Sequence, residues 1–303
     1  MKHLLAISRD RDGMTRSAMP SLLHLHEIAM MKRSELESVV QALTTSAYLG
    51  NSTAVVRILG RYKLYVDTRD RGFGSHLLLD GFWEIWLTQF CARNVKPGMT
   101  AIDIGANFGY YSVLLGELVG QTGKLLAVEP NPHAADFLGR SLDLNGLLSR
   151  SRIERAVLGS GGTDTAKLFV RDHEPKNATV VASSFNAAHH NGYLVTVPAK
   201  TVDQLCEHYE RVDFIKIDAE GAEEDILFGM KKTIERHRPM IVLEFNAARY
   251  ANSRSFVESL VKIYGNLRHL DFQGVAHPVT ADALLSENVG QDWLLVFTDG
   301  DPA

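Results

Sequence analysis

Short apolar runs alternate with glycine-containing turns and helical patterns from residue 97 toward the end of the chain. Helical patterns such as YSVLLGELV and HAADFLGRSLDLNG lie between most of the runs. Because each helix must carry the chain back across a sheet, the alternation predicts an α/β fold with a doubly wound, mostly parallel sheet. The runs that predict strands are TAIDI (100–104), LLAVE (125–129), RIERAVL (152–158), DFIKID (213–218) and MIVLEF (240–245).

Two segments depart from this alternation. Residues 160–199 contain KLFV, TVVAS and YLVTVPA, which predict an inserted antiparallel β ribbon. Near the end, NLRHLDF and DWLLVF predict two strands with a weak helical pattern between them. An antiparallel final hairpin on the parallel sheet accounts for that spacing.

The first hundred residues follow a different pattern. Residues 1 to about 33 lack clear periodicity, so we expect them to be loosely organised or packed on a partner. Ser34 and Glu37 form a capping-box pattern that predicts a helix from about 35 to 47. The run VVRILGRYKLYV (55–66), broken at Gly60, predicts a small β hairpin or two short strands.

Composition excludes several classes of function. The 32 basic and 36 acidic side chains give a net charge of −4, so we expect no binding to nucleic acid or to an anionic membrane. The N-terminal apolar run is too short for a signal peptide or a membrane span. Cys91 and Cys206 lie far apart and form no metal-binding pattern. Reduced buried thiols of this kind are typical of a cytoplasmic protein.

The loop after the first predicted strand, Gly105-Ala106-Asn107-Phe108-Gly109, indicates the cofactor. A dinucleotide fingerprint needs a glycine where Asn107 stands, so that the backbone can approach a pyrophosphate. Asp103 would repel a phosphate but could bind an ammonium, directly or through water. S-adenosylmethionine has no phosphate and carries an α-amino group. Glu129 ends the second strand, where an acid accepts hydrogen bonds from ribose hydroxyls. Taken singly, Asp103 could merely cap the next helix.

Two longer stretches resemble the FkbM-like family of S-adenosylmethionine-dependent methyltransferases. They are KPGMTAIDIGANFGYYSVLLGELVGQTGKLLAVEPNP and VDFIKIDAEGAEEDILFGMKKTIERHRPMIVLEFN, and the upstream segment RDRGFGSHLLLDGFWE is similar too. The resemblance covers roughly residues 55 to 299. It implies a Rossmann-like class I fold with a seven-stranded sheet and a reversed last strand. We therefore predict a methyltransferase domain over 55–303, and an N-terminal extension over 1–54 that is a candidate homodimer contact.

The resemblance also implies the cofactor-binding residues. Asp103, Gly105, Asn107 and Gly109 would surround the methionyl end of S-adenosylmethionine, whose product is S-adenosylhomocysteine. Tyr110 and Tyr111 open the helix beside it, although both could instead be core aromatics. The residues that would hold ribose and adenine are Glu129, Pro130 and Asn131.

The motif Lys216-Ile217-Asp218-Ala219-Glu220-Gly221 supplies the candidates for catalysis. Asp218 ends its strand at the edge where ligands bind in open α/β sheets, and it could face the sulfonium methyl of S-adenosylmethionine or take a proton from an acceptor hydroxyl. Glu220 is a second candidate base, and His76 in a polar loop is a third. A lysine within a central strand is costly unless it is paired, so we predict that Lys216 pairs with Glu244.

Magnesium is the alternative use of these acids. Asp218, Glu220 and Glu244 could bind Mg²⁺ through oxygen, but the paired Asp-Asn of metal-dependent relatives is not evident, so we assign no metal. The resemblance implies O-methylation, and we expect a small hydroxylated acceptor, either a saccharide or a secondary metabolite. Two other functions stay open: an NAD-dependent oxidoreductase on the same fold, and a non-catalytic cofactor-binding scaffold.

Overall fold

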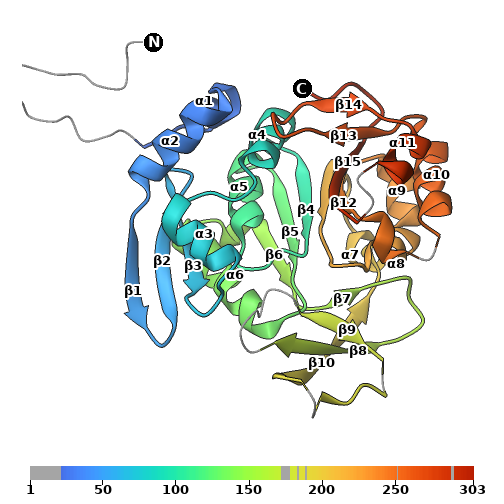
Figure 1. Cartoon of the computed structure of the whole chain (residues 1–303), viewed down its shortest axis with the longest axis horizontal. Coiled ribbons are helices and arrows are strands. Elements are labelled where there is room, and N and C mark those ends of the chain that lie inside the picture. Colours follow the sequence, from blue (N-terminus) through green and yellow to red (C-terminus); the bar gives the residue numbers. More distant parts are fainter. Residues whose placement is uncertain (1–21, 172–177, 183, 188–189, 251, 288–289) are drawn as a thin grey trace, which may run out of the picture.

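The computed structural model describes residues 22–303 except 172–177, 183, 188–189, 251 and 288–289. A central sheet of eight strands runs in the order β14-β13-β15-β12-β11-β4-β5-β6 (Figure 1). Its strands are β4 (Thr100–Ile104), β5 (Lys124–Val128), β6 (Ser151–Glu154), β11 (Phe214–Ile217), β12 (Met240–Phe245), β13 (Arg268–Leu270), β14 (Ala276–Pro278) and β15 (Trp293–Phe297).

The direction of the strands confirms the Rossmann-like fold class. Strands β6, β5, β4, β11 and β12 are parallel neighbours. The last strand, β15, inserts antiparallel between β12 and β13, as the resemblance implies. The expected number of seven strands is one too low, because the chain turns back after β13 and adds β14 at the edge.

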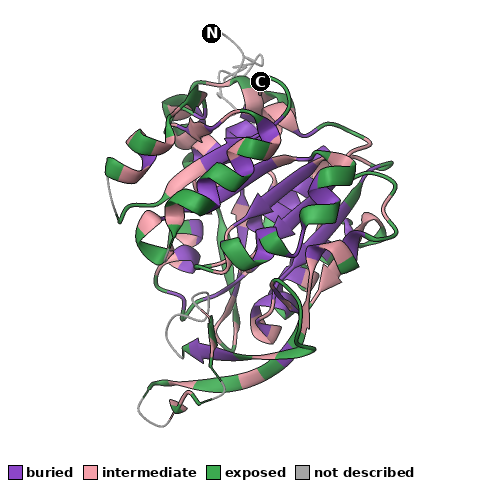
Figure 2. Cartoon of the chain, turned by 90° about the vertical axis from the view of Figure 1, so that its right-hand side faces the viewer, coloured by how far each residue is buried: buried purple, intermediate pink, exposed green. Residues whose placement is uncertain are grey.

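Two layers of helices cover the sheet, so its central strands are buried on both faces (Figure 2). One layer contains α4 (Ile85–Asn94), α5 (Tyr110–Leu118) and α6 (Pro132–Leu144), and the other contains α7 (Val202–Cys206), α8 (Glu223–Phe228), α9 (Lys231–His237), α10 (Ser253–Tyr264) and α11 (Ala281–Ser286). Side chains alternate between the layers along each strand: Phe214 packs with the first, whereas Ile215 and Ile217 pack with the second. Short 3₁₀ helices occur at η1 (Leu148–Arg150) and η4 (Ala247–Arg249).

The N-terminal part packs on the first layer. A three-stranded antiparallel sheet runs in the order β1-β2-β3, where the sequence predicted a hairpin or two short strands. The predicted helix is shorter than expected because the chain becomes extended at Thr44 and enters the first strand. The proposed boundary after residue 54 falls inside a strand, and the division into two domains stays a prediction. The elements are α1 (Leu25–Met30), α2 (Arg33–Leu43), β1 (Ser46–Gly50), β2 (Thr53–Ile58), β3 (Tyr62–Asp67) and α3 (Phe73–Asp80). Of the aperiodic segment 1–33, residues 1–21 lie outside the described part.

The predicted insertion forms its own sheet, in the order β7-β10-β8-β9. Its pairs β10–β8 and β8–β9 are antiparallel, which confirms the ribbon expected over 160–199. The strand expected over 152–158 is divided, because the chain leaves the central sheet after β6 and joins the insertion. The inserted strands are β7 (Val157–Leu158), β8 (Thr165–Arg171), β9 (Thr179–Val181) and β10 (Gly192–Lys200).

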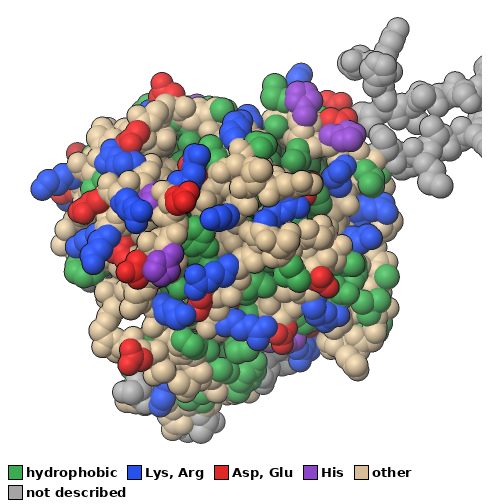
Figure 3. All heavy atoms as spheres, turned by 180° about the vertical axis from the view of Figure 1, so that it is seen from behind, with side chains coloured by type: hydrophobic (Ala, Val, Ile, Leu, Met, Phe, Trp, Pro, Cys, Tyr) green, Lys and Arg blue, Asp and Glu red, His purple; other side chains and the backbone are tan. Residues whose placement is uncertain are grey.

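The outer surface carries mixed charge. On the face in Figure 3, Lys and Arg side chains are interspersed with Asp and Glu side chains, as the near-neutral composition leads one to expect. Among the described residues, no helix combines the length and the apolar character that crossing a bilayer requires.

Candidate active site

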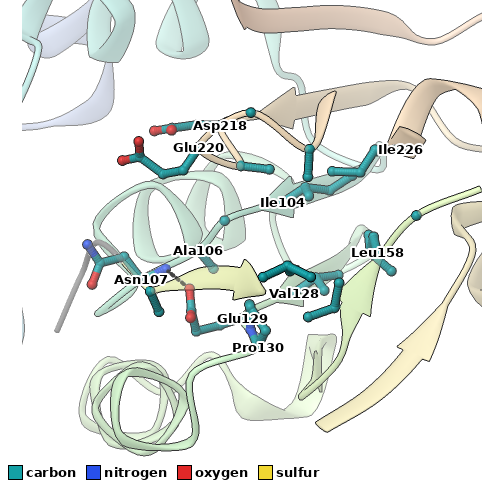
Figure 4. Close-up of a pocket in the computed structure, with 18 of the residues that line it drawn as sticks. Ile104, Ala106, Asn107, Val128, Glu129, Pro130, Leu158, Asp218, Glu220 and Ile226 are labelled. Carbon is teal, nitrogen blue, oxygen red and sulfur yellow. Dashed lines mark hydrogen bonds between the residues drawn. The ribbon is translucent and has the colours of Figure 1, made fainter. Parts of the chain in front are cut away.

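A cavity of about 1060 Å³ lies at the carboxyl ends of the parallel strands, where β4, β5, β11 and β12 run into their loops. This is the edge at which open α/β sheets bind ligands. In Figure 4, Asp218 and Glu220 mark an acidic end of the cavity, whereas Glu129 lies apart from them, next to Pro130. Among the residues that line it are Glu84, Gly105, Asn107, Glu129, Leu158, Lys216, Asp218, Glu220, Glu244, Arg249 and Asp292.

The glycine loop is held tightly against the chain that leaves β11. Gly105 has φ +77°, and a Cβ at this position would lie 1.8 Å from the Asp218 carbonyl oxygen. Only glycine fits this contact. Asn107 also has a positive φ, 50°, which is uncommon for a residue with a side chain. Its backbone N–H donates to Oε2 of Glu129 at 2.7 Å. The loop and the end of β5 therefore form one rigid wall of the cavity.

Glu129 is the acid on that wall. Its side chain is nearly buried, and its Oε1 accepts a hydrogen bond from the backbone N–H of Asn131 at 2.8 Å. Burial raises the pKa of Glu129 to about 7, although the two backbone N–H donors oppose the shift. The carboxylate thus sits where a donor from a ligand would stabilise its charged form.

This raised pKa predicts how the stability of the ligand-free protein depends on pH. The folded state keeps the Glu129 proton up to about pH 7, whereas the unfolded chain loses it near 4.5. Stability should therefore fall as the pH rises from about 4.5 to 7, by at most about 3 kcal/mol from this group. Urea unfolding at pH 5 and pH 8 should show a smaller drop for Glu129→Gln than for the wild type. Equal drops in the two proteins would contradict the prediction.

Asp103 lies behind the cavity lining rather than on it. The side chain is fully buried, and Ser112 Oγ donates to its Oδ2 at 2.6 Å. Its Oδ1 lies 3.9 Å from Lys216 Nζ and accepts no hydrogen bond from the described residues. Burial raises the pKa of Asp103, while the Lys216 charge acts in the opposite direction. Asp103 therefore influences the cavity through Lys216, and the structure does not show it in a position to touch a ligand directly.

The predicted partner of Lys216 is wrong. Lys216 Nζ lies 3.3 Å from Oδ2 of Asp218 and 4.9 Å from the centre of the Tyr111 ring, and its ion pairs among the described residues are with Asp103 and Asp218. Strand register explains the correction. Lys216 stands opposite Asp103 on β4 and opposite Val242 on β12, two residues before Glu244.

Glu244 instead belongs to a carboxyl pair with Asp218. Burial and the neighbouring Asp218 charge raise the pKa of Glu244 to about 9. Burial alone would raise the pKa of Asp218, but Lys216 and the hydrogen bond with Glu244 lower it. The pair therefore holds one proton at neutral pH, on the Glu244 side.

Arg249 on η4 forms ion pairs with three carboxyl groups at the acidic end of the cavity. Its guanidinium contacts Glu244 at 3.4 Å, Asp292 at 3.1 Å and Glu220 at 3.8 Å. Glu220 has φ 53°, so the loop after β11 is strained where it reaches the cavity. Within the described part of the chain, no group of three or more His, Cys, Asp and Glu side chains is arranged to hold a metal ion.

Besides Asp103, three residues from the predicted site do not line the cavity. His76 is 62% exposed on α3, and its Nδ1 lies 3.0 Å from Oδ2 of Asp80. Gly109 allows helix packing, because a Cβ there would lie 2.7 Å from Cδ1 of Leu138. Asn131 caps α6 by accepting from the backbone N–H of His133 at 3.0 Å. By contrast, Gly105, Asn107, Tyr110, Tyr111, Glu129, Pro130, Asp218 and Glu220 all line it.

The predicted site omits three residues that line the cavity, namely Phe73, Trp83 and Glu84. Glu84 has φ 39° and precedes α4, and the Tyr111 hydroxyl donates to its Oε2 at 3.0 Å. The available signal was an acid directly before an amphipathic helix in a segment similar to the family. The inserted sheet adds Leu168 and Val180 to the lining. All five of these additional lining residues lie outside both the glycine loop and the Asp218 motif.

Comparison with known proteins identifies the family. The sequence profile of the methyltransferase FkbM domain matches residues 103–273, more than half of the chain. The chain belongs to the FkbM methyltransferase family. The matched domain is described as a methyltransferase domain and not as a nicotinamide-dependent oxidoreductase. The match contains the glycine loop, Glu129 and the Asp218 motif, whereas Glu84 lies before it.

Individual relatives cover parts of this FkbM-family chain. The methyltransferase sdnD of Sordaria araneosa is 31% identical over 163 residues, which are 45% of this chain and 62% of sdnD. A protein-L-isoaspartate O-methyltransferase of Aeropyrum pernix is 39% identical over 66 residues, 22% of this chain and 24% of that enzyme. The chain thus spans less than two thirds of either relative. Among solved structures, an FkbM methyltransferase of Methylobacillus flagellatus is 16% identical, with 73% of this chain and 52% of that chain covered and a TM-score of 0.41.

Proposed function

We propose that this protein is an S-adenosylmethionine-dependent O-methyltransferase that acts on a hydroxyl of a small acceptor, either a saccharide or a secondary metabolite. The observation that carries the proposal is the wall formed by Asn107 and Glu129, which presents a carboxylate and leaves no glycine for a pyrophosphate. The family assignment supports methyl transfer in general. The choice of a hydroxyl acceptor rests on the carboxyl groups of Asp218, Glu220 and Glu244 at the acidic end of the cavity.

The lining residues fit S-adenosylmethionine. Glu129 can accept hydrogen bonds from the two ribose hydroxyls. Apolar side chains that would enclose an adenine are Val128, Pro130, Leu158 and Ile226, grouped in Figure 4 on the side away from Asp218. The methionyl part would lie over Gly105, toward Lys216 and Asp218. When bound, the cofactor supplies a methyl group on a positively charged sulfur, which is open to attack by an oxygen nucleophile.

The cavity has room for an acceptor as well. A single drug-sized ligand occupies a pocket of about 300–1000 Å³, and this cavity of about 1060 Å³ is slightly larger than that range. Its remaining part is bordered by the carboxyl groups of Asp218, Glu220 and Glu244. Carboxylates can accept hydrogen bonds from hydroxyl groups and can take a proton from one of them.

Calorimetry with S-adenosylhomocysteine tests the cofactor assignment. Glu129→Ala should weaken binding about 100-fold, because two hydrogen bonds to a charged group contribute about 1.5 kcal/mol or more each. The matched control is Glu207→Ala, since Glu207 is exposed beyond α7, and we expect its affinity to stay within threefold of the wild type. If the wild type binds neither S-adenosylmethionine nor S-adenosylhomocysteine, the proposed function is wrong.

Methyl transfer from radiolabelled S-adenosylmethionine to a panel of sugars, phenols and polyols tests the reaction itself. We expect label in an acid-stable, base-stable methyl ether of one acceptor class. Cofactor binding without transfer to any member would instead favour a non-catalytic cofactor-binding scaffold.

A further inference from the structure

The order of strands separates the two ends of the cavity. Glu129 follows β5, on one side of β4, whereas Asp218 and Glu244 lie at the ends of β11 and β12, on the other side. A cofactor whose ribose lies at Glu129 and whose methionyl part lies over β4 directs its methyl group toward β11 and β12. The group that takes the acceptor proton should therefore be sought at this second end.

The two bases suggested by the DAEG motif are already engaged there. Asp218 is paired with Lys216 and shares a proton with Glu244, so its pKa is lowered. A carboxylate that is stabilised in this way is a weak base. Glu220 lies 3.8 Å from Arg249, and nearly half of its side chain is exposed to solvent. These pairings make both groups poorer candidates for the base than an acid without a cationic partner.

Glu84 is placed differently. It reaches the cavity from the turn before α4, and its backbone is held at φ 39° and ψ 64°, a strained conformation that persists at functional sites. The Tyr111 hydroxyl donates to Oε2 and fixes the carboxyl group, while no Lys, Arg or His of the described residues lies within ion-pair distance of it. No hydrogen bond to Oε1 occurs within the described part of the chain, which leaves that oxygen available for an acceptor.

The surroundings of Glu84 shift its pKa toward the value that suits proton transfer at neutral pH. The groups that face it are Asp218 and Lys216 from β11 and its loop, Tyr111 from α5 and Asp292 from the segment before β15. Burial and the Asp218 charge raise the pKa of Glu84 to about 7, against the opposing effects of Lys216 and the Tyr111 hydroxyl. A general base acts best when its pKa is close to the working pH.

We propose that Glu84 is the general base of the methyl transfer, an assignment that rests on the proposed function. The acceptor O–H proton moves to Oε1 of Glu84, and the oxygen electron pair forms the new bond to the methyl carbon. The electron pair of the broken C–S bond stays on sulfur, which becomes neutral. The carboxylate gains one proton, so charge is conserved, and the proton later leaves to solvent.

Glu84→Gln keeps the shape of the side chain and removes the base. With the acceptor found in the panel, kcat/KM should fall about 100-fold or more. The wild-type kcat/KM should decline below about pH 7, and this decline should be absent in the variant. S-adenosylhomocysteine affinity, measured by calorimetry, should stay within threefold of the wild type. The matched control is Glu207→Gln, the same change at an exposed position beyond α7 and outside the cavity, which should keep both activity and affinity.

Carboxyl ¹³C NMR of glutamate-labelled protein gives a readout without any acceptor. The resonance that disappears in Glu84→Gln should titrate near pH 7, and titration near 4.5 would overturn the assignment. A tenfold or greater loss of S-adenosylhomocysteine affinity would also overturn it, because Glu84 would then hold the cofactor. If the variant keeps more than a third of wild-type kcat/KM, only the base assignment fails. If the wild type fails to bind either cofactor form, the function fails and the assignment with it.

Discussion

Replacing Lys216 by methionine should destabilise the folded protein by about 3–5 kcal/mol, the usual result of removing one partner from a buried ion pair. Lys216 is 3% exposed, and its Nζ is the cation next to the fully buried Asp103. Methionine fills much of the same volume, so the loss arises from the carboxylate and not from a cavity. Urea unfolding at pH 7 measures the change in the free energy of unfolding.

A double substitution separates this effect from lost packing. Lys216→Met combined with Asp103→Asn removes both charges, and we expect it to recover at least half of the stability lost in the single variant. A single-variant loss below about 1 kcal/mol would show that the pair contributes little to stability. An unrecovered double variant would show that packing, and not the unpaired charge, explains the loss.

Gly105→Ala should abolish measurable S-adenosylhomocysteine binding and lower stability as well. The new Cβ would lie 1.8 Å from the Asp218 carbonyl oxygen, which is a backbone atom and cannot move aside as a flexible side chain could. The loops after β4 and β11 must therefore separate, and both line the cavity. Calorimetry should show an affinity at least 100-fold weaker than that of the wild type.

The control for Gly105→Ala is Gly146→Ala. Gly146 has a similar positive φ, 68°, but a Cβ there would meet no atom within 4 Å. This variant should show only the cost of the left-handed backbone, about 1–2 kcal/mol, and unchanged cofactor affinity. Equal effects of the two substitutions on binding would contradict the argument from close contact.

Local patterns in the sequence explain how much of the site was predictable. One β–α–β unit contains Gly105, Asn107 and Glu129. The pairing of its two strands brings these residues together independently of the rest of the fold. The strand and the acid of the Asp218 motif follow the same logic. Lys216 was correctly predicted to need a partner, since a lone cation in a central strand is costly. Its partner was wrong because pairing depends on strand register, which alternation along one strand does not give.

The cavity end that would face an acceptor could not be predicted in this way. Glu84, Arg249 and Asp292 come from segments far apart in the sequence, and they approach one another only when the turn before α4, η4 and β15 pack at one edge. His76 could not be assigned from the sequence either. It was a candidate base in a predicted loop, but it lies on α3, whose orientation directs its side chain to solvent.

The sequence by itself determined the alternating α/β architecture, the glycine loop and the acid at the end of β5, because each depends on interactions within a single strand–turn–helix unit. The tertiary structure alone decided that Lys216 lies between Asp103 and Asp218, and that Glu84 reaches the cavity beside Tyr111. These contacts arise from the order and register of strands and from the packing of distant loops, and both are set by the burial of the whole sheet between its helices.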